Sequence, residues 1–270
     1  MSNNERELGL AMLKSLFGQV PIIGWGLNEV IFDRRSRVKQ DRVNRFSELL
    51  SEYMETVSES TIDLEYLKSN EFGDIFESVI HRIMQTDNEF KLKRFRDILI
   101  GNLITPNRSE FTETFLDLTT RLNESQIQIL ERYARLEQKV KTNFDIISDQ
   151  TTLLQESDTK LIELKQKAQD GIITPNESIA SQQKKHAQIE LTKSRANDEL
   201  ARLFRQRQAS SFSLPEGEFQ FYLQDLVSKS LMKESFTSRQ RQKMNSISSK
   251  HEVTEFGYRY LSYILDTDFS

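Results

Sequence analysis

The sequence predicts a mainly α-helical fold with an N-terminal helical bundle, a long polar helical hairpin and a small C-terminal winged-helix-like α+β module. Apolar residues recur at intervals of three and four over much of residues 1–122, which is the spacing of amphipathic helices. A stretch poor in apolar residues follows, from Glu137 to about Gln208. Only four prolines and nine glycines occur in 270 residues, so few segments are interrupted.

An apolar segment, residues 8–32, opens the N-terminal part. Its two apolar runs, Leu10–Phe17 and Val20–Phe32, meet at a Gly-Gln-Val-Pro sequence that favours a turn. We therefore expect a helical hairpin whose arms are each shorter than the roughly 20 apolar residues that cross a bilayer. It either packs on the bundle or inserts into a membrane as an oligomer. The predicted membrane or self-assembly site is its centre: Pro21, Ile22, Ile23, Gly24, Trp25 and Gly26.

A dense basic run follows the apolar segment at the predicted start of the next helix. It consists of Arg34, Arg35, Arg37, Lys39, Arg42 and Arg45. Three interpretations are open: a solvated helix face, a surface that binds anionic lipid, or a nucleic-acid contact. Anionic lipid is favoured over nucleic acid because the run directly follows an apolar hairpin and has no aromatic residues interleaved for base stacking.

Four amphipathic patterns predict the rest of the N-terminal bundle, residues 1–122. They run from Val38 to Val57, from Phe72 to Ile83, from Phe90 to Leu103, and over a shorter stretch from Phe111 to Leu122. Each leaves one apolar and one polar face. Helices joined by such short polar links form an antiparallel bundle.

Residues 123–212 are predicted to hold the first helix of the C-terminal module and an inserted hairpin. The helix carries apolar residues from Ile127 to Leu136 and runs into the polar stretch. Sparse apolar residues then fit two helices around a turn at Gly171–Asn176. We expect a protruding helical hairpin or coiled coil, because the stretch is too polar to form its own core.

Residues 213–270 are predicted to form the winged-helix-like module. A helix through Phe219 and Val227 precedes a short apolar strand at 231–233, a polar region, a strand at 251–254 and a last helix, Glu255–Leu265. Winged helices often dock proteins. The basic residues that would contact DNA instead are Arg239, Arg241, Lys243 and Lys250.

Catalytic and metal-binding patterns are missing from the sequence. There is no cysteine, which excludes thiolate nucleophiles, disulfides and zinc ribbons. His81, His186 and His251 each have a glutamate four residues away, but two ligands do not make a metal site. No glycine-rich loop carries the lysine and hydroxyl residue of a P-loop. We therefore expect a protein that is not an enzyme and has no metal and no cofactor.

Composition and charge indicate a reducing compartment. The cysteine-free chain suits the cytoplasm, and its polar start lacks the pattern of a secretory signal. We expect a cytoplasmic protein, peripheral at the inner membrane if the apolar segment contacts lipid. The net charge of −4 argues against a surface built as a whole for nucleic acid.

Two motifs resemble a known group of proteins. They are the segment from Val20 to Gly26 with the basic helix start behind it, and the C-terminal segment from Glu252 to Leu261. Together they resemble bacterial abortive-infection phage-defence proteins of the alpha type. The resemblance implies a role in antiviral defence with action at the membrane, and it implies no catalytic residues.

These observations predict a non-enzymatic defence or stress protein. Its C-terminal module and polar hairpin would dock a partner protein, while the N-terminal segment acts by membrane contact or self-assembly. Two alternatives remain. The chain is a cytoplasmic helical scaffold or adaptor, or it is a winged-helix regulator that binds DNA.

Overall fold

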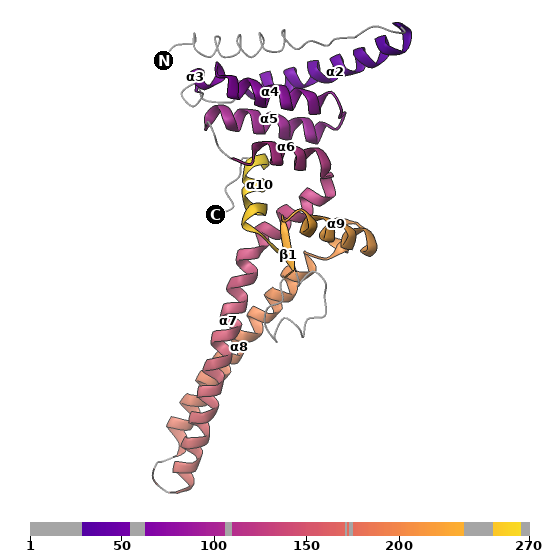
Figure 1. The fold of residues 1–270 in the computed structure, drawn as a ribbon. Helices are drawn as coiled ribbons and strands as arrows, with labels where there is room; N and C mark the ends of the chain where they lie inside the picture. The colour runs from indigo at the N-terminus through magenta and orange to yellow at the C-terminus, as the bar shows by residue number, and fades with distance from the viewer. Residues whose placement is uncertain are drawn as a thin grey trace. The chain divides into compact units, whose positions relative to one another are not determined.

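The structure, a computed structural model, is mainly helical. It describes residues 29–54, 63–105, 110–170, 172, 175–234 and 251–265. Within these ranges the chain forms nine α-helices, one short 3-10 helix and two short strands near the C-terminus (Figure 1). The predicted mainly α fold with a small α+β part is therefore confirmed. The predicted site Pro21–Gly26 lies outside the described residues, as does the apolar hairpin up to residue 28.

The chain divides into two compact units. Unit 1 contains the residues up to Glu124 and those from Tyr258 onward, and unit 2 is Ser125–Gly257. The sequence grouped residues 213–270 into one module. In the structure the last helix, α10 (Glu255–Leu265), begins in unit 2 and contributes most of its length to unit 1.

Unit 1 is a helical bundle built around α5. Its helices are α2 (Glu29–Met54), α3 (Leu64–Leu67), α4 (Asn70–Ile83), α5 (Glu89–Ile104) and α6 (Thr112–Arg121), with α10 from Tyr258. Helix α5 contacts α2, α3, α4 and α6, and its residues from Ile98 to Leu103 are all buried. The predicted apolar stripes form the core, which includes Phe46, Phe72, Phe76, Phe95 and Phe115.

Side-chain caps fix where three helices of unit 1 begin. The Asp63 carboxylate accepts from the backbone of Glu65 and Tyr66, the Ser69 hydroxyl accepts from the Phe72 N–H, and the Asn88 amide accepts from the Lys91 N–H. These bonds satisfy N–H groups that the first turn of a helix leaves without partners. The short helix α3 was not predicted, since its four residues are too few to show a period.

Two tyrosines attach α10 to the bundle. The Tyr263 hydroxyl lies 2.6 Å from the buried Asn102 amide nitrogen and 2.8 Å from the Thr112 hydroxyl. The Phe115 ring packs against the rings of Tyr260 and Tyr263, with centroids 5.6 and 5.1 Å away. Burial raises the pKa of Tyr260 to about 12, so its hydroxyl stays neutral inside the core.

One member of a predicted apolar stripe is not in the core. The sequence pattern placed Phe90 with Phe95 and Ile98, but Phe90 is 56 % exposed in the structure. Phe90 precedes Phe95 by five residues, which turns it about 140° away from Phe95 around the helix. It therefore lies outside the buried face of α5.

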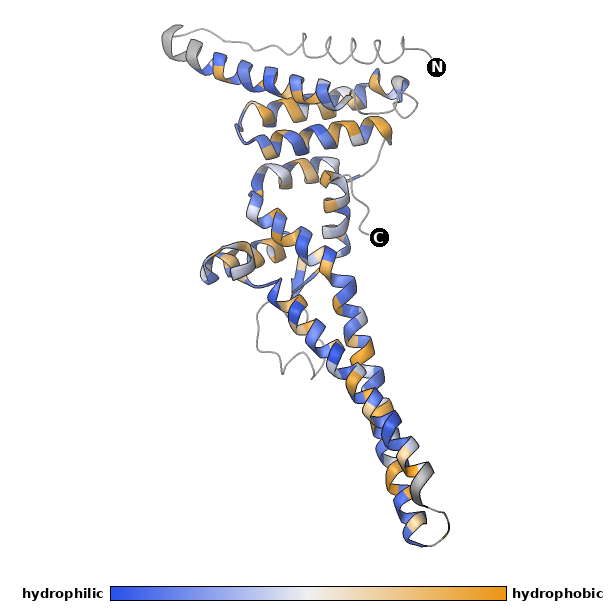
Figure 2. Cartoon of the chain, turned by 180° about the vertical axis from the view of Figure 1, so that it is seen from behind, coloured by the Kyte–Doolittle hydropathy of each residue, from blue (hydrophilic) through white to orange (hydrophobic). Residues whose placement is uncertain are grey.

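Unit 2 combines a long helical hairpin with a small α+β part. Its elements are α7 (Glu124–Gln169), α8 (Pro175–Arg205), the 3-10 helix η2 (Ala209–Phe212), α9 (Glu216–Ser228), β1 (Met232–Glu234) and β2 (His251–Val253). Helices α7 and α8 run side by side in opposite directions (Figures 1 and 2). The predicted first helix is thus the start of one continuous 46-residue helix. The turn between α7 and α8 lies where it was predicted.

The two strands pair in antiparallel register, with Met232 opposite Val253 and Glu234 opposite His251. The Thr254 hydroxyl accepts from the Gly257 N–H, and the Thr254 N–H donates to the Leu231 carbonyl. A Cβ on Gly257 would lie 2.2 Å from that same carbonyl oxygen. The motif that carries the C-terminal resemblance therefore has a structural purpose: it begins α10 and lets the helix pass close to Leu231.

We expect replacement of Gly257 by alanine to destabilise unit 2. The new methyl group would overlap a backbone carbonyl, and overpacking of this kind costs about 1–3 kcal/mol. Gly217 in α9 is a matched control, because a Cβ there meets nothing within 4 Å. Alanine at Gly217 should stabilise the chain by about 0.5–1 kcal/mol. Urea unfolding followed by circular dichroism measures both changes, and equal midpoints for the two variants would contradict the packing argument.

Candidate functional site

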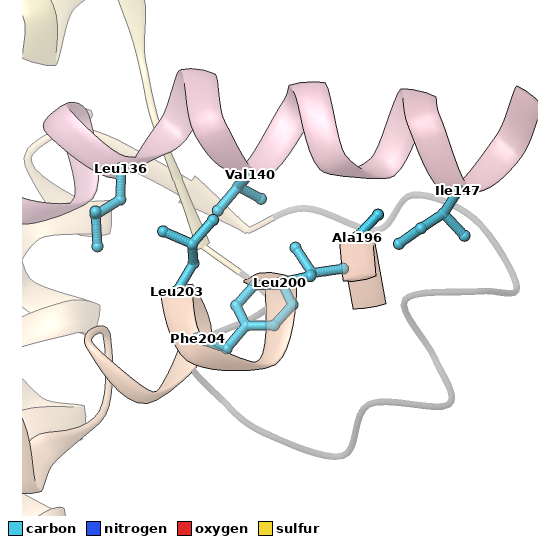
Figure 3. Packing of buried hydrophobic residues seen from close by; sticks show 7 residues of the cluster. All are labelled: Leu136, Val140, Ile147, Ala196, Leu200, Leu203 and Phe204. Atoms are coloured by element: carbon cyan, nitrogen blue, oxygen red, sulfur yellow. The ribbon is translucent and has the colours of Figure 1, made fainter. Parts of the chain in front are cut away.

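The hairpin of unit 2 is anchored by an apolar cluster at its base. Leu136, Val140 and Ile147 of α7 point toward residues of α8 (Figure 3). The facing residues are Ala196, Leu200, Leu203 and Phe204. The Phe144 ring packs on Phe204 with centroids 6.1 Å apart. This cluster joins the two helices where they enter the rest of unit 2.

A buried ion pair lies beside the cluster. The Arg207 Nη2 donates to the Glu137 carboxylate at 2.9 Å and to the Tyr133 carbonyl at 2.9 Å. Arg207 and Glu137 are 1 % and 2 % exposed. The guanidinium also lies 4.6 Å from the centre of the Tyr133 ring, and the Tyr133 hydroxyl donates to the Arg207 carbonyl. These contacts fix the end of α8 against α7, and burial raises the pKa of Tyr133 well above its usual value.

The ion pair is incompletely satisfied. Among the described residues, the second Glu137 oxygen and the Arg207 Nε have no hydrogen-bond partner. A buried charge without full hydrogen bonding costs free energy, and separating the pair would cost more. The pair therefore specifies which residues meet at the base and adds little net stability over an apolar pair.

The outer part of the hairpin, residues 148–195, is the distal arm. The less exposed residues of each helix alternate at spacings of three and four, as in a coiled coil. On α7 they are Gln150, Leu154, Ser157, Leu161, Leu164 and Ala168, with Thr151 beside Gln150, and on α8 they are Ile179, Gln182, His186, Ile189 and Lys193. Among the described side chains of the distal arm, only Ser157 is fully buried. The arm is thus a two-helix pair with a thin, partly polar seam.

Polar residues join the two helices midway along the distal arm. The Gln182 amide donates to the Ser157 hydroxyl at 3.0 Å, and the His186 Nε2 lies 2.9 Å from the Asp158 carboxylate. Glu190 lies 3.9 Å from the other His186 nitrogen. A polar pair at a seam position fixes the register of a coiled coil at some cost in stability.

Four large apolar residues of the distal arm are exposed. Leu153, Ile162 and Leu191 are 42, 70 and 50 % exposed, and Ile172 at the turn is 69 % exposed. Each lies outside the seam, so none contributes to the pairing of α7 with α8. They are available for contact with another molecule.

The predicted anion-binding run lies within α2, and the structure gives its members different environments. The run does not begin the helix, since α2 starts at Glu29. The Arg42 guanidinium donates to the Met84 carbonyl at the end of α4, and Arg45 pairs with Glu48 and Glu89. The Glu89 hydrogen bond raises the pKa of Arg45, with Glu48 adding to it. These two residues hold α2 to the bundle.

Residues 35–42 of α2 are predominantly hydrophilic (Figure 2). Arg35, Arg37 and Lys39 are exposed, and Val38 between them is 43 % exposed. Arg35 and Lys39 form no ion pair with the residues that the structure describes. Among the members of the predicted set whose side chains the structure describes, these two are the ones most available to an external anion.

The described part of the chain contains no candidate metal site and no candidate membrane span. Its histidine, aspartate and glutamate side chains nowhere gather in threes as a metal would require. His81 lies 3.9 Å from Glu77 on the surface of α4, and His251 lies in β2. Among the helices that the structure describes, none has the length and apolar character of a membrane span.

Comparisons with known proteins give no match. No protein-family model, no curated protein and no solved structure is similar to this chain.

Sequence reasoning did not identify the buried ion pair, although the positions of its two residues gave an indication of it. Arg207 continues the spacing of Leu200 and Leu203, and Glu137 directly follows Leu136. Charged residues that extend an apolar repeat mark positions where a pair is buried. The sequence alone did not indicate that the two would meet, since 70 residues separate them.

We expect separation of the Arg207–Glu137 pair to unfold the base of the hairpin. Arg207→Met leaves the Glu137 carboxylate buried without a partner, which costs about 3–5 kcal/mol. Adding Glu137→Leu should restore most of the loss, because an apolar pair replaces the ion pair. Urea unfolding of the single and double variants measures both effects. The exposed Arg202–Glu199 pair is the control, and Arg202→Met should leave the unfolding midpoint unchanged.

Proposed function

We propose that this chain is a non-enzymatic interaction protein that docks a partner protein on its distal arm. The observation that supports this most is the contrast between the two parts of the hairpin. The base is packed and ion-paired, whereas residues 148–195 have one fully buried side chain among those described. An element that adds so little to its own core is best explained by contact with another molecule.

The charge of α9 supports protein docking over DNA binding for the C-terminal module. In a winged helix the helix before the first strand is the one that enters the DNA groove. Here that helix is α9, which has no lysine or arginine and carries Glu216, Glu218 and Asp225. Phosphate contacts would require the opposite charge. The basic residues Arg239, Arg241, Lys243 and Lys250 lie outside the described residues.

A photo-cross-linking residue placed in the distal arm tests the docking proposal in native cells. Leu153 and Ile162 are exposed and lie outside the seam, so replacement should leave the fold unchanged. We expect both positions to yield the same cross-linked partner. Phe221 of α9 is the control, because its 63 % exposure lies between those of Leu153 and Ile162 and it lies outside the arm.

A shortened chain provides a second test of the docking proposal. Replacing residues 148–195 with a short glycine–serine linker keeps the apolar cluster and the Arg207–Glu137 pair. The shortened chain should unfold at nearly the same urea concentration and should lose the partner. A cross-linked homodimer would identify a second copy as the partner. Absence of any arm-specific product would refute docking on the arm.

Membrane contact by α2 is a second proposed activity, and the exposed cations of its first half support it. Arg35 and Lys39 lie beside the exposed Val38 on a helix that begins at Glu29, within the last residues of the apolar N-terminal segment. Basic residues next to apolar ones are attracted by anionic lipid, and each contributes about 1 kcal/mol near such a surface. In this proposal the protein lies at the cytoplasmic face of the inner membrane.

We expect the double variant Arg35→Gln, Lys39→Gln to bind anionic vesicles about thirtyfold more weakly, because two cations that each contribute about 1 kcal/mol are removed. Flotation with phosphatidylglycerol-containing vesicles measures this. The variant Lys184→Gln, Lys185→Gln removes the same charge from exposed positions on the arm and should bind as the unaltered chain does. Equal weakening by both pairs would show that net charge alone is responsible. A chain that does not float at all would remove the membrane proposal.

The setting we propose for these activities is antiviral defence. It is supported by the resemblance of the two short motifs to abortive-infection proteins. Plaque counts on cells with and without the chain test this setting, and the shortened chain is the control. Unchanged plaque counts over a broad set of phages would count against it.

A further inference from the structure

The outer face of α7 in the distal arm carries charged residues that are exposed to solvent. Between Gln155 and Gln169 every residue outside the seam is exposed, and these residues form the outer face. Its charged members are Glu156, Asp158, Lys160, Glu163, Lys165 and Lys167. The Asp158 carboxylate contacts His186 of α8 through one oxygen, and its side chain is still 62 % exposed. The other five form no ion pair with residues that the structure describes.

These charges have a reciprocal order about the midpoint between Leu161 and Ile162. Residues at equal distances from this midpoint carry opposite charges, and no charged residue of the outer face is left over. The three mirror pairs are Lys160 with Glu163, Asp158 with Lys165, and Glu156 with Lys167. A segment with this order is complementary in charge to a second copy of itself that runs in the opposite direction.

The helix also places the members of each mirror pair on the same edge of the outer face. Side chains follow one another at about 100° around an α-helix, so residues seven apart lie on one side. Asp158 and Lys165 therefore lie along one edge, and the other four charged residues, spaced by three and four, lie along the opposite edge. Ile162 lies between the two edges and is 70 % exposed. In a two-fold antiparallel contact each edge meets the same edge of the second copy, so all three pairs can form.

Helix α8 has no such order. Its charged residues, among the described side chains of the distal arm, are Lys184, Lys185, Glu190, Lys193 and Arg195. One acid cannot mirror four bases, so two copies of α8 would repel each other. The self-complementary surface of the arm is therefore on α7.

We propose that a second copy of this chain docks on the outer face of α7 in antiparallel orientation, with the two copies of Ile162 meeting at the two-fold axis. The inference rests on the proposed docking on the distal arm and names the partner. A parallel arrangement would place each charge beside its own copy, so the charges select the antiparallel one. The contact is closed by its symmetry and gives a dimer. Exposed ion pairs contribute little individually, so we expect a weak dimer that high salt dissociates.

Two charge-reversal variants of the full chain test the inference. The first carries Glu156→Lys and Glu163→Lys, and the second carries Lys160→Glu and Lys167→Glu. Each should raise the dissociation constant of the dimer about a hundredfold, because four attractive contacts become repulsive. An equimolar mixture should recover the dimer, because every mirror pair again joins opposite charges. Sedimentation at several concentrations measures the mass, which is 31.6 kDa for one copy.

Two controls accompany these variants. Lys184→Glu, Lys185→Glu reverses two exposed charges on α8 and should dimerise as the unaltered chain does. The shortened chain, which lacks residues 148–195, should be a monomer. Circular dichroism shows whether the variants keep their helices, and recovery of the dimer in the mixture cannot arise from a folding defect.

The outcomes separate this inference from the proposed function. A chain that stays monomeric while its distal arm cross-links to a different protein overturns the second copy and leaves docking on the arm in place. A dimer that survives both charge reversals, a mixture that stays monomeric, or a shortened chain that dimerises equally overturns the contact through the outer face. A monomer whose arm yields no cross-linked product overturns both proposals.

Discussion

The contact between Arg207 and Glu137 determines how unit 2 is assembled. It joins a residue just beyond α8 to the first third of α7, and the Tyr133 ring and carbonyl complete its surroundings. Removal of two charges from water is costly, so the pair forms only when both residues reach the same position. This requirement selects one arrangement of the helices. The apolar cluster beside it then supplies the stability that the ion pair does not.

Polar contacts also specify the packing of unit 1. The Tyr263 hydroxyl accepts a hydrogen bond from the Asn102 amide and forms another with the Thr112 hydroxyl, which attaches the last helix to α5 and α6, while the aromatic rings around Phe115 fill the space between them. In both units an apolar core provides most of the free energy of folding, and a few buried polar groups decide which surfaces meet. In the described part of the chain, the segments outside these cores include residues 35–42 of α2, the start of α5 and the distal arm.

Periodicity predicted the elements that bury one clear face. The stripes of α4 and α5, the long hairpin and the order of α9, β1, β2 and α10 follow from local spacing and turn residues. Contacts between distant residues leave no such pattern, which is why the Arg207–Glu137 pair and the attachment of α10 to unit 1 were not foreseen. Phe90 was misplaced because an apolar residue near a helix start was counted with a stripe five residues away. The exposure of a side chain depends on which helices pack around it, and the sequence does not show this packing.

The unbroken course of α7 gives the hairpin the properties of a lever. From Glu137 to Gln169 the helix rises about 48 Å at 1.5 Å per residue, so a tilt of only about 5° at the base displaces the turn by about 4 Å. The buried Arg207–Glu137 pair is the fixed point, and the distal arm, which has almost no core of its own, is the part that is displaced. A small rearrangement around Arg207 therefore produces a larger displacement at the turn. In the same way, a force applied at the turn produces a larger force at the base of the hairpin.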